Sequence, residues 1–287
     1  MASHYEDRFW TSEDGLNLHY RDYAGPDGYH GPPVLCMHGL TRNARDFADL
    51  AEHLCETRRV IVPEMRGRGM SDYAPSWETY NPMQYVGDVE RLLAEQGIEQ
   101  FISVGTSMGG LMTMLMAAAK PGRIAALVMN DIGPEIDPSG IERIGTYVGQ
   151  GGSYPTWIHA ARSLGDVHGN SFPDYTLDKW LEMAKRTLVV SQNGRISYDY
   201  DMAIAEPFKQ AGNAAPPNLW LAYEALKNVP MVLVRGKLSD LLTPETVAQM
   251  GARNPAMTTV TVPRVGHAPT LDEPEARAAI DALLAGV

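Results

Sequence analysis

The sequence is poor in cysteine and in basic residues. Two of its 287 residues are cysteine, too few for a disulfide framework, and we expect both to be reduced core residues. Lysine and arginine total 24 against 35 aspartate and glutamate, which gives a net charge of -11. A chain of this charge repels phosphate backbones and acidic lipid surfaces. We therefore expect a small-molecule substrate as partner, with no nucleic acid and no membrane.

The sequence also has no apolar run of about 18 residues, the length that a membrane span needs. The longest run, Leu111–Ala119, is interrupted by Thr113. The first residues, Met1–Arg8, carry Glu6 and Asp7 where a secretory signal has a basic start and an apolar run. We therefore expect a cytoplasmic protein. No dinucleotide fingerprint, phosphate loop or cluster of metal ligands stands out, so we expect no cofactor and no metal. Nothing in the sequence bears on the oligomeric state.

Short apolar runs alternate with segments of helical periodicity along most of the chain. Runs of the kind that form buried strands lie at 34–37, 60–62, 101–104, 124–129, 231–234 and 258–262. Amphipathic helical patterns separate them, at 82–96, 109–119, 244–251 and 274–284. This alternation predicts an α/β protein with a mainly parallel central sheet and helices on both faces.

The alternation stops in the middle of the chain. Between Gly133 and Lys227 the sequence is rich in Gly, Tyr and Trp, has amphipathic helical patterns and lacks apolar strand runs. We interpret residues 134–227 as a helical cap inserted into a core made of residues 1–133 and 228–287. Trp157 and Tyr147 are expected to line an apolar substrate pocket. Arg66, in a turn-rich segment, could bind a substrate carboxylate, although a solvent-exposed turn is the alternative interpretation.

The sharpest local motif is Gly105-Thr106-Ser107-Met108-Gly109, which follows one apolar strand and opens a helix. Glycines at both ends permit a turn so tight that a side chain there would collide with neighbouring backbone. Such a turn lifts the serine hydroxyl out of the end of the sheet. A serine hydroxyl becomes a nucleophile only beside a base that a carboxylate orients.

Candidates for both partners follow strands of the same predicted sheet. His267 lies in the loop after the last strand and would emerge at the same edge as Ser107. Asp240 follows the strand at 231–234, and Asp131, which follows the strand at 124–129, is the alternative acid. The backbone N–H groups of Met108 and Leu40 are placed to stabilise the oxyanion that forms when serine attacks.

These motifs together resemble the α/β-hydrolase fold family over nearly the whole chain. The resemblance rests on His38-Gly39, the turn at 64–71, the elbow at 105–110, Asp240 and Gly266-His267. The order Ser, Asp, His matches the order of the family. The resemblance implies a serine nucleophile, a histidine base, an aspartate partner and a lid inserted after the sixth strand. A subgroup of lactone hydrolases takes its acid from the end of the sixth strand, which keeps Asp131 open.

We therefore expect a serine hydrolase that cleaves a small carboxylic ester or lactone through an acyl-enzyme on Ser107. Family members that release halide or open epoxides have aspartate at the elbow, which Ser107 speaks against. The carbon–carbon bond hydrolases that act on ring-cleavage diketones are an alternative, because they resemble this chain in the Ser-Met-Gly-Gly elbow. They differ in the loop after the third strand and in having Trp soon after the catalytic His. A second alternative is a ligand receptor on the same fold that turns over slowly.

Overall fold

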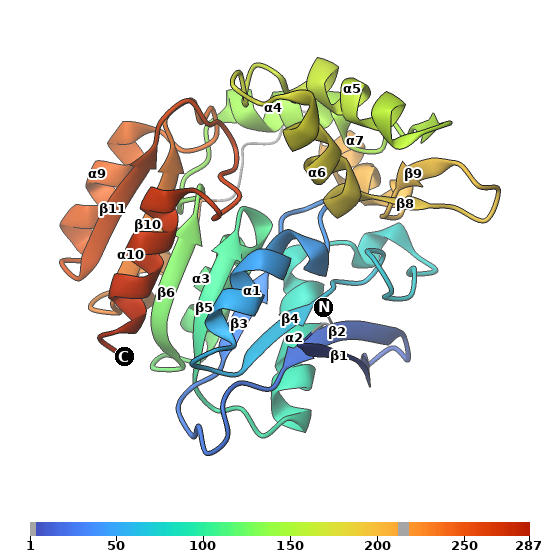
Figure 1. Cartoon of the computed structure of the whole chain (residues 1–287). Coiled ribbons are helices and arrows are strands. Elements are labelled where there is room, and N and C mark those ends of the chain that lie inside the picture. Colours follow the sequence, from blue (N-terminus) through green and yellow to red (C-terminus); the bar gives the residue numbers. More distant parts are fainter. Residues whose placement is uncertain (1–3, 212–217) are drawn as a thin grey trace.

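Eight strands form one twisted sheet in the computed structural model, which describes residues 4–211 and 218–287 (Figure 1). The strands, in sheet order, are β1 (Tyr5–Thr11), β2 (Asn17–Tyr23), β4 (Val60–Pro63), β3 (Val34–Met37), β5 (Phe101–Thr106), β6 (Ile124–Asn130), β10 (Met231–Gly236) and β11 (Met257–Val262). From β4 to β11 all neighbours pair in parallel, whereas β2 is antiparallel to both β1 and β4. The expected α/β fold class is confirmed.

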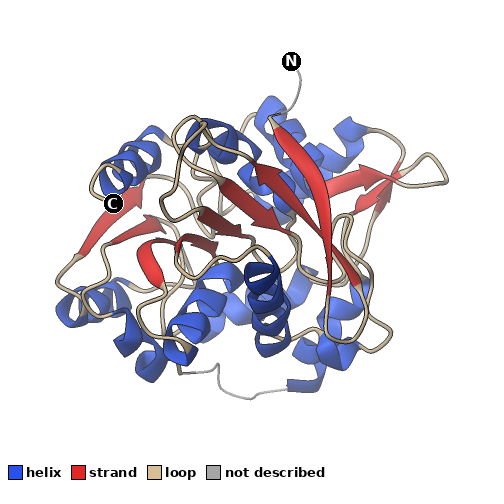
Figure 2. Cartoon of the chain, turned by 90° about the horizontal axis from the view of Figure 1, so that it is seen from below, coloured by secondary structure: helices blue, strands red, loops and turns tan. Residues whose placement is uncertain are grey.

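Helices cover both faces of this sheet, as Figures 1 and 2 show. One face packs against α1 (Ala48–Leu54) and α10 (Pro274–Leu284), and the other against α2 (Pro82–Glu95), α3 (Met108–Ala119) and α9 (Pro244–Arg253). The central strands β3 and β4 are apolar throughout because both of their faces are covered, and every residue of each is buried, whereas the edge strand β1 is mostly exposed. Each face therefore has its own apolar core, and the carboxyl ends of the parallel strands meet at one edge.

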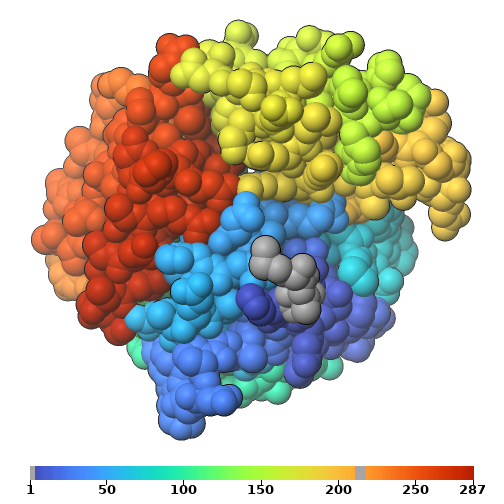
Figure 3. Space-filling view, in the orientation of Figure 1, coloured from blue at the N-terminus to red at the C-terminus, as the bar shows by residue number. Residues whose placement is uncertain are grey.

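The chain between β6 and β10 adds no strand to this sheet within the described residues. Its elements are α4 (Pro138–Tyr147), β7 (Ser153–Tyr154), α5 (Trp157–His168), α6 (Leu177–Thr187), β8 (Leu188–Val190), β9 (Ile196–Tyr198), η3 (Met202–Ala205), α7 (Glu206–Ala211), α8 (Trp220–Tyr223) and η4 (Glu224–Leu226). The helices α4 to α6 lie over the carboxyl edge of the parallel strands (Figure 1). In the space-filling view this part, in yellow-green and yellow, lies directly against the blue N-terminal and red C-terminal parts (Figure 3). We call residues 134–211 of this segment the cap layer.

The cap layer is not made of helices alone. Its strands β7, β9 and β8 form a small antiparallel sheet. Sequence patterns did not indicate it, because the strands are only two or three residues long and Val189 and Val190 on β8 face solvent. The end of the segment between β6 and β10 does not lie over the carboxyl edge of the sheet. Its elements α8 and η4 pack against α3, on the face of the main sheet.

Two short 3-10 helices, η1 (Ala44–Phe47) and η2 (Trp77–Thr79), complete the described elements. Both cysteines are free thiols; Cys36 is buried and Cys55 is partly buried. Among the described residues, no helix combines the length and the apolar character that crossing a bilayer requires.

Candidate active site

Ser107 occupies the tight turn between β5 and α3. Its backbone lies at φ 51° and ψ -113°, a region that non-glycine residues rarely adopt. A Cβ at Gly109 would lie 2.0 Å from the carbonyl oxygen of Met37, and one at Gly105 would lie 2.7 Å from the backbone of Gly109. Any side chain at either position would therefore force β5, α3 and β3 apart. The tight turn with a required glycine at each end is therefore present, and it projects Ser107 from the carboxyl edge of the sheet.

Ser107 begins a chain of three hydrogen-bonded side chains. His267 Nε2 lies 2.8 Å from Ser107 Oγ, and His267 Nδ1 lies 2.8 Å from Asp131 Oδ2. The second oxygen of the Asp131 carboxylate accepts the N–H of Gly236 at 2.9 Å. Asp131 is fully buried, so its charge is held by these two donors rather than by water. This geometry allows the imidazole to take the hydroxyl proton while the carboxylate stabilises the resulting imidazolium.

Asn130, the last residue of β6, holds the two loops of this chain together. Its side-chain amide donates to the carbonyl of Pro269 at 2.8 Å, just after His267, and to the hydroxyl of Thr106 at 3.0 Å. Its carbonyl accepts the N–H of Ser107 at 3.0 Å. One buried residue thus fixes the separation of the serine turn and the histidine loop.

Asp240 is not the partner of His267, which corrects the first choice made from the sequence. Its carboxylate forms a two-pronged ion pair with Arg143 of α4, with Arg143 Nη2 2.9 Å from Oδ1. Burial acts to raise the pKa of Asp240, but the hydrogen bonds and charge of Arg143 outweigh it and hold that pKa below its usual value. The alternative, Asp131, occupies the position beside His267, since β6 and β10 are neighbours and both end at this edge.

The backbone N–H groups of Leu40 and Met108 have no acceptor among the described residues. Two side chains fix the loop that carries Leu40 by hydrogen bonds to its carbonyl groups. His38 Nδ1 donates to the carbonyl of Gly39 at 2.7 Å, and Arg68 Nε donates to the carbonyl of Leu40 at 2.9 Å. Burial, with the charge of Arg68, lowers the pKa of His38 to about 4. A neutral His38 therefore orients the loop so that two N–H groups stay available for an oxyanion.

A cavity of about 120 Å³ opens above Ser107 and His267, between the core and the cap layer. Most of its wall is apolar or aromatic, and the cap layer supplies much of it. The cap residues that line it are Ile144, Tyr147, Val148, Leu164, His168, Phe172, Trp180, Met183, Arg186, Thr187, Tyr198 and Tyr200. Tyr147 therefore lines the cavity, as expected from the sequence. Trp157 does not line it and packs against the apolar core on the face that α1 and α10 cover. His168 and Arg42 also line the cavity, but the sequence does not indicate this because neither residue belongs to a recognisable motif.

Arg66 does not reach the cavity, which corrects its proposed role in binding a carboxylate. Its side chain is fully buried, and its guanidinium forms paired hydrogen bonds to Asp88 at 2.7 Å and to Asp14 at 2.7 and 2.8 Å. Its charge is therefore used by the buried carboxylate of Asp88 and by the exposed carboxylate of Asp14. The exposed turn that the sequence suggested is covered in the fold.

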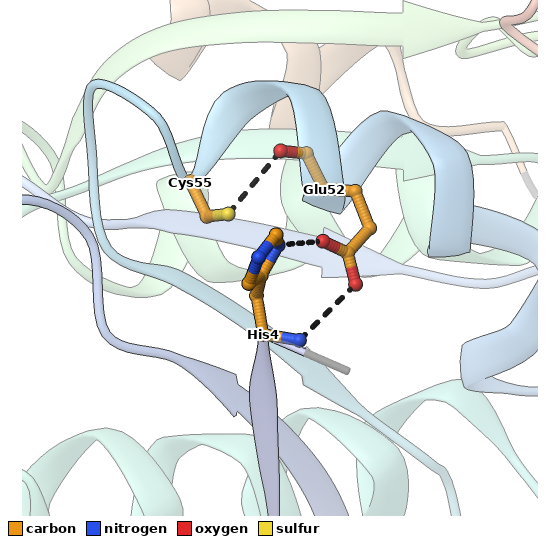
Figure 4. Close-up of side chains that lie close together, drawn as sticks. All are labelled: His4, Glu52 and Cys55. Atoms are coloured by element: carbon orange, nitrogen blue, oxygen red, sulfur yellow. Dashed lines mark hydrogen bonds and ion pairs between the residues drawn. The ribbon is translucent and has the colours of Figure 1, made fainter. Parts of the chain in front are cut away.

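One group of three side chains in the part of the chain described here brings potential metal-ligating atoms together. It consists of His4, Glu52 and Cys55, whose ligand atoms all lie within 4.8 Å of one another (Figure 4). The figure shows His4 paired with the carboxylate of Glu52 and the Cys55 thiol directed at the Glu52 carbonyl, 3.2 Å away. None of the three lines the cavity. This group is therefore separate from the candidate active site.

Comparison with known proteins agrees with the fold described above. The family model described as alpha/beta hydrolase fold matches residues 32–274. The chain is 38% identical over 275 residues to a 3-hydroxybutyrate-oligomer hydrolase of Cupriavidus necator, covering 92% of this chain and 91% of that protein. It is 24% identical to a 2-(acetamidomethylene)succinate hydrolase of Mesorhizobium japonicum, covering 83% and 82%. The crystal structure of an alpha/beta hydrolase from Novosphingobium aromaticivorans matches with a TM-score of 0.95 and 55% identity over 100% of both chains. The chain therefore belongs to the α/β-hydrolase fold family, and it is a hydrolase.

Proposed function

We propose that this hydrolase cleaves esters of small carboxylic acids through an acyl-enzyme on Ser107. The observation that carries the proposal is the continuous chain from Ser107 Oγ through His267 to Asp131, with both links at 2.8 Å. It stands at the base of a cavity that the cap layer closes from above. In this proposal Ser107 is the nucleophile, His267 the base and Asp131 the acid.

In the first half of the reaction, Ser107 Oγ attacks the ester carbonyl carbon and its proton passes to His267 Nε2. The carbonyl oxygen becomes negative and accepts hydrogen bonds from the N–H groups of Leu40 and Met108. The intermediate then collapses, the bond to the alcohol oxygen breaks, and the alcohol leaves with the proton from His267. Asp131 keeps Nδ1 of the imidazole protonated and stabilises its positive charge.

The second half repeats these steps with water. Water attacks the acyl carbon, gives a proton to His267 and forms a second tetrahedral intermediate. The bond to Ser107 Oγ breaks, the serine recovers its proton from His267, and the carboxylic acid leaves. The neutral state of His38 and the contact of Arg68 with Leu40 keep the loop of the oxyanion donors in place throughout.

One observation favours an ester over the carbon–carbon bond that the sequence left open. A relative that covers most of this chain is named as a hydrolase of 3-hydroxybutyrate oligomers, in which the hydroxyl of one unit is esterified to the carboxyl of the next. The cavity volume of about 120 Å³ suits a short chain. We therefore propose a short linear ester as substrate, with a lactone as the cyclic form of the same chemistry and the cap layer, within residues 134–227, as the lid over it.

The test compares the wild type with Ser107→Ala and with Ser139→Ala, a control at the exposed N-terminus of α4. The substrates are 4-nitrophenyl butyrate, the dimer of 3-hydroxybutyrate, an aromatic lactone and a vinylogous diketone. We expect ester turnover that falls by at least about 10⁴-fold in Ser107→Ala and is unchanged in Ser139→Ala. A fluorophosphonate should label Ser107 alone. Faster cleavage of the diketone than of any ester, or a single burst without turnover, would overturn the proposal.

A further inference from the structure

Several polar side chains line the cavity outside the proposed catalytic chain, and His168 is the one imidazole among the lining residues that the cap layer supplies. It is the last residue of α5, in the cap layer, and its side chain lines the same cavity as Ser107. Neither ring nitrogen has a hydrogen-bond partner within residues 4–211 and 218–287. A polar group placed in a largely apolar wall without a protein partner is suited to bind a polar group of a ligand.

The ring of His168 is held in place by an aromatic contact. Tyr147 of α4 meets it edge to face, with ring centroids 4.9 Å apart and the planes at 81°. The guanidinium of Arg143, which Asp240 binds, lies 5.9 Å from the Tyr147 ring. The orientation of the imidazole therefore depends on its contact with Tyr147 and not on a hydrogen bond to the described residues.

Burial, together with the charges of two nearby arginines, favours the neutral form of the His168 imidazole. Burial and the nearby charges of Arg42 and Arg143 lower the pKa of His168 to about 4. Both arginines are themselves paired, Arg42 with Asp46 at 2.6 to 2.9 Å and Arg143 with Asp240. The site is therefore close to neutral as a whole. A neutral imidazole offers one N–H donor and one nitrogen acceptor.

The geometry points to His168 as a specificity residue that hydrogen-bonds a hydroxyl group on the acyl chain of the ester. A hydroxyl both donates and accepts, as a neutral imidazole does, whereas a carboxylate would seek a free cation. Both arginines that line the cavity are already paired, Arg42 with Asp46 and Arg186 with Asp49 and Asp272. The acyl chain is the part that stays bound to Ser107 beneath the cap after the alcohol leaves. This inference rests on the proposed ester hydrolysis and adds the class of acyl group, a hydroxyacyl group.

The kinetic test uses two substrates that differ by one oxygen, 4-nitrophenyl 3-hydroxybutyrate and 4-nitrophenyl butyrate. For the wild type we expect kcat/KM to be about tenfold higher for the hydroxy ester, the size of one hydrogen bond that would otherwise be left unmade. His168→Phe keeps a flat ring against Tyr147 and should bring the ratio to about one by lowering the rate on the hydroxy ester alone. Tyr147→Phe keeps the edge contact and should leave the ratio as in the wild type.

An unchanged ratio in a folded His168→Phe variant, or no preference in the wild type, overturns the inference. So does loss of the preference in Tyr147→Phe, because the phenol would then be the group that binds the hydroxyl. His168→Asn, which retains a donor and an acceptor, should recover part of the preference and replaces His168→Phe if that variant does not fold.

A binding measurement separates this inference from the proposed function. In the Ser107→Ala protein, the imidazole resonances of His168 are followed by NMR while 3-hydroxybutyrate or butyrate is added. A shift with 3-hydroxybutyrate that butyrate does not produce supports a hydroxyl subsite even if no ester is ever turned over. Equal shifts with both acids, or none, overturn the subsite while leaving ester hydrolysis to stand on its own test.

Discussion

The carboxyl edge of the sheet and the cap layer build the two halves of one cavity in different ways. At the edge of the sheet, Ser107, His267 and Asp131 are linked to one another, and Asn130 ties their loops together. In the cap layer, His168 has no hydrogen-bond partner among the described residues and is placed by packing. The three side chains of the proposed catalytic chain are hydrogen-bonded to one another before any substrate arrives. In the inference drawn above, the substrate itself supplies the partner of His168.

The largest expected effect is the loss of kcat when the carboxylate beside His267 is replaced. In Asp131→Asn the amide oxygen can still accept the N–H of Gly236, but the side chain no longer stabilises a positive His267, so kcat should fall by about 10⁴-fold. In Asp240→Asn only the partly exposed pair with Arg143 is weakened, and kcat should change by less than about fivefold. Steady-state kinetics on 4-nitrophenyl butyrate decide between them. A larger loss of kcat in Asp240→Asn than in Asp131→Asn would show that Asp240 is the catalytic acid.

A smaller effect is expected at Arg66, where replacement tests whether its buried charge stabilises the fold or binds the substrate. Arg66→Met leaves Asp88 inside the core without its partner, and we expect the free energy of unfolding to drop by about 3–5 kcal/mol. KM of the folded fraction should stay unchanged, because Arg66 does not line the cavity. Urea unfolding and kinetics at low temperature measure the two quantities. If Arg66→Met instead raised KM and left the free energy of unfolding unchanged, Arg66 would be a substrate-binding residue.

The smallest effect concerns the cap layer at acid pH. The pKa of His168 is about 4 in the folded chain and about 6.5 in an unfolded one, so between these values the unfolded state binds more protons. His168 therefore contributes stability that is present above pH 6.5 and is lost as the pH falls toward 4. The free energy of unfolding of His168→Gln, measured by urea at pH 7.0, 5.5 and 4.5, should decline less steeply than that of the wild type. Parallel curves for the two proteins would contradict a neutral His168.

The sequence was sufficient for the serine turn and the histidine loop because local backbone demands reveal them. Gly105 and Gly109 are required by close contacts of the turn itself, and His267 follows the strand at the end of the sheet. The acid could not be chosen in the same way. Val234 of β10 pairs with Asn130 of β6, so the residues after both strands emerge side by side, and only the pairing of Asp240 with Arg143 separates them.

Other features lay beyond sequence reasoning because distant residues determine them. Arg66 resembles a residue in an exposed turn until Asp14 and Asp88, 52 and 22 residues away, are brought to it. The strands of the cap layer are too short for a period-two pattern to show. His168 stands at the end of a helix, where a histidine usually faces water, and only the fold turns it into the cavity.

The ion pair between Asp240 and Arg143 has a consequence for how such a fold can diversify. Since β6 provides the carboxylate beside the imidazole, the loop after β10 is released from chemistry and can act as an anchor for α4. An exchange of α4 would then require redesign of this ion pair and of the neighbouring backbone hydrogen bond from Asp137 to Leu241, while the bond from Gly266 to Ser171 is kept beside His267. Enzyme engineers who wish to transplant a foreign lid onto this scaffold have a natural attachment point in residue 240.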